Sequence, residues 1–101
     1  MSVRILIVDD SPAIRRSLCV LVAEESDWEI CGEAENGKLA VEMARRLLPD
    51  VVVLDLSMPV MNGLEAARQI RETGPNIHIF FSPCTLPHNY WRRLAKPELT
   101  Q

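Results

Sequence analysis

The stretch Val51-Val52-Val53-Leu54-Asp55-Leu56-Ser57-Met58-Pro59-Val60-Met61-Asn62-Gly63 decides how this chain folds. An uninterrupted apolar run, rich in β-branched residues, ends on one carboxylate, Asp55, and a Pro/Asn/Gly loop follows. Such a run is typical of a strand that is covered on both faces in a parallel α/β sheet. Sheets of this kind carry their chemistry just beyond the carboxyl ends of the strands, where Asp55 stands. An isolated aspartate in a loop is more often a helix cap or a turn residue, so its interpretation depends on other acids.

Three further strands and three helices are indicated around this stretch. The predicted strands are residues 3–8, 28–34 and 77–81, of which 28–34 alternates more, carries charges and suits an edge position. The predicted helices run over about 12–24, from Gly37 to just before Pro49, and over about 63–72. The second helix is expected to turn Leu39, Ala40, Met43, Ala44 and Leu47 inward, and the third Leu64, Ala67 and Ile70. Strands that alternate with helices over short loops predict a parallel sheet with helices on both faces.

Composition excludes several classes of protein. The 101 residues are expected to form one domain, and 48% hydrophobic content is enough for a core. A net charge of −3 argues against nucleic acid or acidic membranes as direct partners. No apolar run approaches the ~20 residues of a membrane span, and no signal peptide is evident, so we expect a cytoplasmic protein.

The three cysteines, Cys19, Cys31 and Cys84, are widely spaced and are expected to be buried free thiols. Arg45 and Arg46 lie in the last turn of the second predicted helix, where positive charges interact favourably with the helix dipole. We expect them to be solvated and assign them no function.

A second acidic site follows the first predicted strand, which ends on Asp9-Asp10. If the strands 3–8 and 51–54 are neighbours, Asp9, Asp10 and Asp55 share one small pocket. Three carboxylates raise one another's pKa there, and a hard divalent cation such as Mg²⁺ is the simplest partner for them. Bound Mg²⁺ would favour an incoming phosphoryl group, with Asp55 as the acceptor nucleophile. Ser82, after the last predicted strand, could place a hydroxyl near the phosphate, although a strand-end serine is commonly a turn former.

Taken together, the segments Leu6-Ile7-Val8-Asp9-Asp10-Ser11, Val53-Leu54-Asp55-Leu56-Ser57-Met58-Pro59 and Asn62-Gly63 resemble the receiver domain of two-component response regulators. The resemblance covers about residues 3–82. It implies an α/β, flavodoxin-like (CheY-like) doubly wound parallel sheet. The segments at 33–37 and 64–70 are further similar to receivers of NarL-type transcriptional regulators.

The resemblance assigns roles residue by residue. It implies that Asp55 accepts phosphate from a sensor histidine kinase, that Asp10 binds Mg²⁺ directly and that Asp9 does so mainly through water. The backbone carbonyl of Ser57 would complete the protein ligands. Ser82 matches the switch hydroxyl that moves toward the phosphate on activation. We therefore expect a phosphoryl-accepting signalling module rather than an enzyme.

The chain departs from the receiver pattern after Ser82. We predict a receiver core at residues 1–82 and an altered or truncated C-terminal segment at 83–101, without the regular fifth strand and fifth helix. Lys96-Pro97 imitates the lysine-proline pair of the family, but it lies close behind Ser82. Lys96 is therefore either the lysine that contacts the phosphate or a solvated tail lysine.

Three other functions compete with this interpretation. A haloacid dehalogenase-type enzyme would have a second acid two residues after the nucleophile, where Ser57 stands. A flavodoxin-like cofactor binder would not carry Asp9-Asp10 in its phosphate loop, because the acids repel phosphate. A degenerate receiver that serves only as an interaction module stays open.

An assembly prediction follows from the predicted strand 77–81. With so short a tail behind it, its edge and its apolar side chains are expected to stay exposed. We therefore expect a homodimer through the C-terminal region, formed by strand pairing or by exchange of the C-terminal segment, since a two-fold contact is the commonest solution for identical chains. The alternative is a monomer in which residues 83–101 fold back as an irregular fifth strand through Leu94-Ala95-Lys96 and place Lys96 at the pocket.

Overall fold

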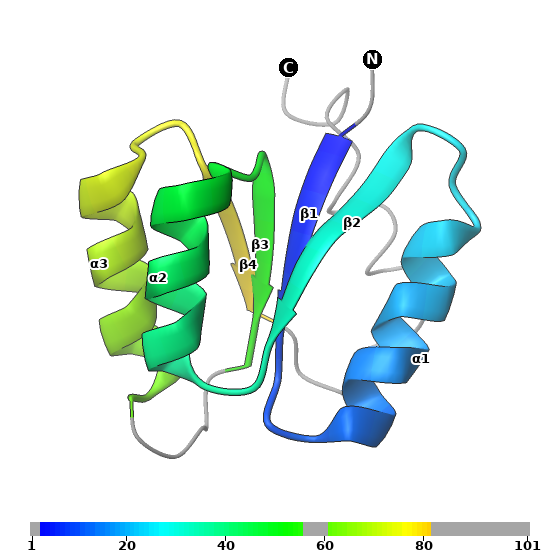
Figure 1. The fold of residues 1–101 in the computed structure, drawn as a ribbon, viewed down its shortest axis with the longest axis horizontal. Helices are drawn as coiled ribbons and strands as arrows, with labels where there is room; N and C mark the ends of the chain where they lie inside the picture. Colours follow the sequence, from blue (N-terminus) through cyan, green and yellow to red (C-terminus); the bar gives the residue numbers. More distant parts are fainter. Residues whose placement is uncertain (1–2, 56–60, 82–101) are drawn as a thin grey trace.

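The computed structural model describes residues 3–55 and 61–81 of the chain. Strands and helices alternate along these residues, and the type of every predicted element is confirmed (Figure 1). The elements are β1 (Val3–Val8), α1 (Pro12–Ala23), β2 (Trp28–Ala34), α2 (Gly37–Leu47), β3 (Val51–Leu54), α3 (Gly63–Thr73) and β4 (His78–Phe81). None of the helices in this part of the chain is long and apolar enough to cross a membrane.

The four strands form one parallel sheet in the order β2-β1-β3-β4. Helix α1 covers one face, and α2 and α3 lie side by side on the other (Figure 1). This arrangement confirms the doubly wound parallel fold and places β2 at an edge, as predicted. The expected lack of a fifth strand and helix concerns residues 82–101, which lie outside the described residues. The division of the chain at residue 82 therefore stays a prediction.

The central strands β1 and β3 are apolar throughout because both of their faces are covered. Alternate residues point to opposite faces of a sheet. Ile5, Ile7 and Val53 pack in the cluster beneath α1, whereas Leu6 and Val52 pack in the cluster beneath α2 and α3. All five side chains are essentially inaccessible to solvent. The continuous hydrophobic run that predicted a covered strand is thus explained by two separate cores, one on each side of the sheet.

Each helix begins with a polar side chain that caps it. The Ser11 hydroxyl accepts a hydrogen bond from the Ile14 N–H, and the Asn36 and Asn62 side chains accept from the N–H groups three residues further on. Caps of this kind satisfy backbone donors that have no partner within the helix. The three helices begin at the same edge of the sheet, where the acids lie (Figure 1).

The predicted inward faces of two helices were partly wrong. Leu39 is 37% exposed and Leu64 is 66% exposed. Mostly small residues line the buried faces instead, namely Gly37, Ala40, Val41 and Ala44 on α2, and Gly63, Ala66, Ala67 and Ile70 on α3. Both sets recur at i, i+3, i+4 and i+7, the spacing of one helical face. Small side chains let the two helices pack against each other, so the larger leucines turn outward.

The cysteines are less buried than predicted. Cys19 and Cys31 are free thiols, as expected, but both are only partly buried, and Cys84 lies outside the described residues. Cys19 lies on α1 and Cys31 on the edge strand β2, where cover from the rest of the fold is incomplete. Burial is nevertheless the main cause that raises the pKa of each thiol. Neither cysteine is therefore placed as a reactive thiolate.

Candidate functional site

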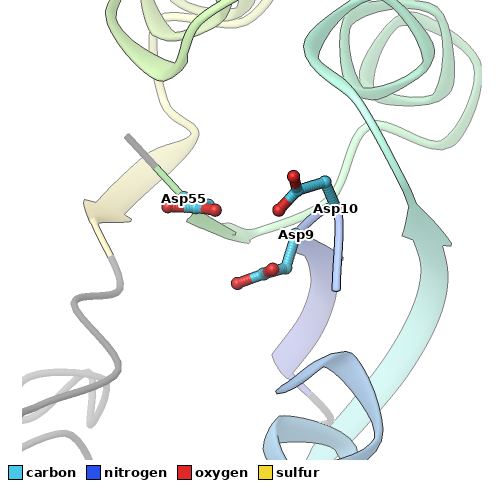
Figure 2. Close-up of side chains that lie close together, drawn as sticks. All are labelled: Asp9, Asp10 and Asp55. Carbon is cyan, nitrogen blue, oxygen red and sulfur yellow. The ribbon is translucent and has the colours of Figure 1, made fainter. Parts of the chain in front are cut away.

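The register of β1 and β3 brings the acids together. Val8 and Leu54 are partners across the two parallel strands, so the residues that follow them leave the sheet next to each other. The Asp55 N–H continues this pairing by donating to the Val8 carbonyl at 3.0 Å. One carboxylate oxygen from each of Asp9, Asp10 and Asp55 lies within 4.8 Å of the others (Figure 2). The adjacency of the strands 3–8 and 51–54, which the sequence left conditional, is thereby confirmed.

Asp9 is the most constrained of the three acids. Only 2% of the surface of Asp9 is exposed to solvent. Its N–H donates to the Ala34 carbonyl at the end of β2, and its Oδ1 accepts a hydrogen bond from the Ser11 N–H at 2.9 Å. By contrast, Asp10 is exposed and Asp55 is partly buried. The site is therefore a buried carboxylate with two more accessible ones beside it.

The surroundings of Asp9 favour its neutral form. Burial raises the pKa of the Asp9 carboxyl, and the negative charges of Asp55 and Asp10 raise it further. The hydrogen bond from the Ser11 N–H is the second-largest influence and lowers the pKa of Asp9, but by less than burial raises it. A positive charge placed among the three oxygens would offset both causes of the rise.

These residues suit a small, hard cation. All three offer carboxylate oxygens, which are preferred ligands of Mg²⁺, and their separation allows one ion to contact more than one of them. A buried carboxylate at Asp9 with two further carboxylates beside it is costly without a counterion. The donor set therefore fits the metal that the sequence suggested.

The remaining predicted site residues cannot be placed. Ser57, Ser82 and Lys96 all lie outside the described residues. Their assignments stay predictions.

Sequence reasoning missed one residue that contacts this site. The Arg15 guanidinium, on α1, donates from NH1 to the Asp9 carbonyl at 2.7 Å, and its Nε lies 3.4 Å from the Glu33 carboxylate on β2. The available signal was the position of Arg15, one turn after the capping Ser11 and five residues after Asp10. A long cationic side chain in the first turns of a helix can reach back to an acidic loop from which that helix begins.

Comparison with known proteins identifies the family. The family described as "Response regulator receiver domain" matches residues 5–95. The protein-glutamate methylesterase/protein-glutamine glutaminase 4 of Hahella chejuensis is 42% identical over 85 residues, which are 84% of this chain and 22% of that protein. The chain thus spans about a fifth of the length of the curated relatives it matches.

Solved structures agree with this result. The response regulator domain of Thermotoga maritima CheB superposes with a TM-score of 0.77 at 29% identity, covering 99% of this chain and 92% of that one. The signal receiver domain of the putative response regulator NarL from Mycobacterium tuberculosis gives a TM-score of 0.75 at 26% identity, covering 90% and 77%. The chain belongs to the response regulator receiver domain family and is a receiver domain of a two-component signalling system.

Proposed function

We propose that this chain accepts a phosphoryl group on Asp55, with Mg²⁺ held by Asp9, Asp10 and Asp55. The observation that carries the proposal is the convergence of the three carboxylates at the carboxyl ends of β1 and β3. The complete set of acids favours a working acceptor over a degenerate receiver, which would have no need to keep three repelling charges in one place.

The chemistry is a transfer between two side chains. A carboxylate oxygen of Asp55 attacks the phosphorus of a phosphohistidine on a sensor histidine kinase, the P–N bond breaks, and its electron pair stays on the imidazole nitrogen. Bound Mg²⁺ supplies positive charge to the phosphoryl oxygens. Asp55 suits the nucleophile because it is partly accessible and is fixed by its N–H bond to Val8, whereas Asp9 is buried and already accepts from Ser11.

Three further residues belong to the proposal through the family resemblance. The Ser57 backbone carbonyl would complete the protein ligands of Mg²⁺, the Ser82 hydroxyl would respond to the phosphate, and Lys96 would contact the phosphate. The proposed module would work in the cytoplasm, together with its kinase.

Phosphorylation by acetyl phosphate, followed by intact mass with and without Mg²⁺, tests the proposal. The parent should gain one phosphoryl group only when Mg²⁺ is present, and Asp55→Asn should gain none. Asp27→Asn is a matched control, because Asp27 is an exposed aspartate that precedes β2. A mass gain that persists in Asp55→Asn would reject Asp55 as the acceptor.

The relatives' names describe methylesterase and glutaminase activities. Because the chain matches only about a fifth of those proteins, these activities are not carried over to it. We propose that the residues 3–81 regulate an output by being phosphorylated and do not themselves hydrolyse a substrate.

We also propose that the chain forms a homodimer through the edge of β4. The predicted exposure of the apolar side chains of the strand 77–81 was wrong, since Ile77 is 6% exposed and Phe80 and Phe81 are partly buried against the cores of the sheet. The support that remains is the strand edge: among the described residues β4 pairs with β3 alone, and an unpaired edge is a template for a further strand. A hollow of about 520 Å³ lies beside it, lined in part by Arg71, Ile77 and Phe80. Size-exclusion chromatography with light scattering over a dilution series tests this. A monodisperse monomer at high concentration would rule it out.

A further inference from the structure

Arg15 joins three elements at the edge of the acidic site. From α1 its NH1 donates to the Asp9 carbonyl at 2.7 Å, and its Nε faces the Glu33 carboxylate of β2 at 3.4 Å. Its side chain is only 18% exposed. A bond from a charged donor is stronger than one between neutral groups, and partial burial protects it from water. The contact is thus suited to hold the backbone of the loop after β1.

The carbonyl that Arg15 binds belongs to the peptide unit between Asp9 and Asp10. The other polar groups of Asp9 are also engaged, since its N–H donates to Ala34 and its Oδ1 accepts from Ser11. These two bonds fix the strand end and the Asp9 side chain, but neither fixes the plane of the following peptide. A change in ψ of Asp9 would turn this carbonyl away from Arg15, move the Cα of Asp10 and swing the Asp10 carboxylate away from Asp55.

We propose that Arg15 is a positioning residue for the metal site: it fixes the peptide between Asp9 and Asp10 and thereby directs Asp10 toward Asp55. This inference rests on the proposed Mg²⁺ site. The planar guanidinium suits the task because it can bond the carbonyl and the Glu33 carboxylate at once, which the single ammonium of lysine does less well. Glu33 in turn holds the guanidinium in place.

Replacing Arg15 should change the Mg²⁺ affinity in opposite directions through the lost charge and through the lost positioning of Asp10. Removing a cation near three acids makes the site more negative, so the charge effect alone would tighten Mg²⁺ binding. Loss of positioning would weaken it. Groups that orient metal ligands typically change the affinity by 10–100-fold when they are replaced. The sign of the change therefore separates the two effects.

The experiment is a calorimetric titration of Mg²⁺ into the parent, Arg15→Met and Arg16→Met. Methionine keeps much of the aliphatic stem and removes the donors and the charge, and Arg16 is an exposed arginine on the same helix. We expect Arg15→Met to bind Mg²⁺ about tenfold more weakly. Arg16→Met should bind as tightly as the parent or slightly more tightly. Affinity in Arg15→Met that equals or exceeds the parent's would overturn the inference.

Circular dichroism would show whether Arg15→Met folds. If it does not, Arg15→Lys is the second variant that tests the inference. Lysine keeps the charge, so a loss of about threefold or more in Mg²⁺ affinity reports lost geometry alone, and an unchanged affinity overturns the inference. A parent that binds no Mg²⁺ would overturn the proposed metal site, and the role of Arg15 with it. If the parent and the Arg15 variants all bind Mg²⁺ with the same affinity, only the role of Arg15 is overturned.

Discussion

Replacing Asp9 by asparagine should stabilise the metal-free domain. Asp9 is buried and lies with Asp10 and Asp55 in a cluster whose carboxylate oxygens are within 4.8 Å of one another. Asparagine removes one charge, yet its side-chain oxygen can still accept the hydrogen bond from the Ser11 N–H. The variant therefore loses the repulsion without losing the contact that orients the side chain.

The magnitude follows from the separation of the charges. At 4.8 Å, two unit charges repel by roughly 0.9 kcal/mol at the dielectric constant of water and by roughly 3.5 kcal/mol at an effective value of about 20. Asp10 is exposed and Asp55 partly so, which keeps each pair well below the upper figure. We expect the free energy of unfolding to rise by about 1 to 3 kcal/mol in Asp9→Asn.

Urea denaturation in the presence of a chelator measures this difference. Glu29→Gln is the control, because Glu29 is an exposed acid on the edge strand β2, and its replacement should change stability by less than about 0.5 kcal/mol. With Mg²⁺ added, the parent should gain about 2.7 kcal/mol at a hundred times its dissociation constant, and Asp9→Asn should gain less. A metal-free variant that is no more stable than the parent would refute the reasoning.

The same charge gives a pH dependence with a definite sign. The pKa of Asp9 is raised in the folded domain above its ordinary value of 3.8, so the folded state binds more protons than the unfolded state between these two pKa values. Stability that depends on Asp9 therefore falls as the pH rises through this window and is lowest above the folded pKa. The advantage of Asp9→Asn should accordingly shrink as the pH is lowered from neutral toward 3.8.

Three further predictions concern the scaffold. Leu48 has a left-handed backbone with φ of 49° and is 58% exposed, so Leu48→Gly should stabilise the domain by about 1 kcal/mol in urea denaturation; a loss of stability would contradict this. A Cβ at Gly37 would lie 2.5 Å from the Met61 carbonyl oxygen, so Gly37→Ala should destabilise by about 1–3 kcal/mol, and an equal denaturation midpoint would count against it. Ile70→Ala should cost about 2–5 kcal/mol, whereas Leu64→Ala on the same helix should cost less than about 0.5 kcal/mol; similar losses would show that the buried face is misassigned.

Local patterns were sufficient to predict the elements of this domain. The apolar runs of β1 and β3, the caps at Ser11, Asn36 and Asn62, and the stop before Pro49 depend on neighbours in the chain. For this reason their bounds were predicted to within about a residue or two. The helix faces were harder, because Leu39 and Leu64 could be ranked by hydrophobicity but not by the close packing of α2 on α3, which favours alanine and glycine there.

The sequence by itself determined that two covered strands end on acids and that their chemistry would suit a cation and a phosphoryl group. Only the tertiary structure decided that β1 and β3 are neighbours, which brings Asp9 and Asp55 together, and that Arg15 reaches the Asp9 carbonyl. The physical reason is the range of the interactions. Periodicity and capping act over a few residues, whereas the order of strands and the reach of a side chain from α1 to the end of β1 depend on how both faces of the sheet are covered at once.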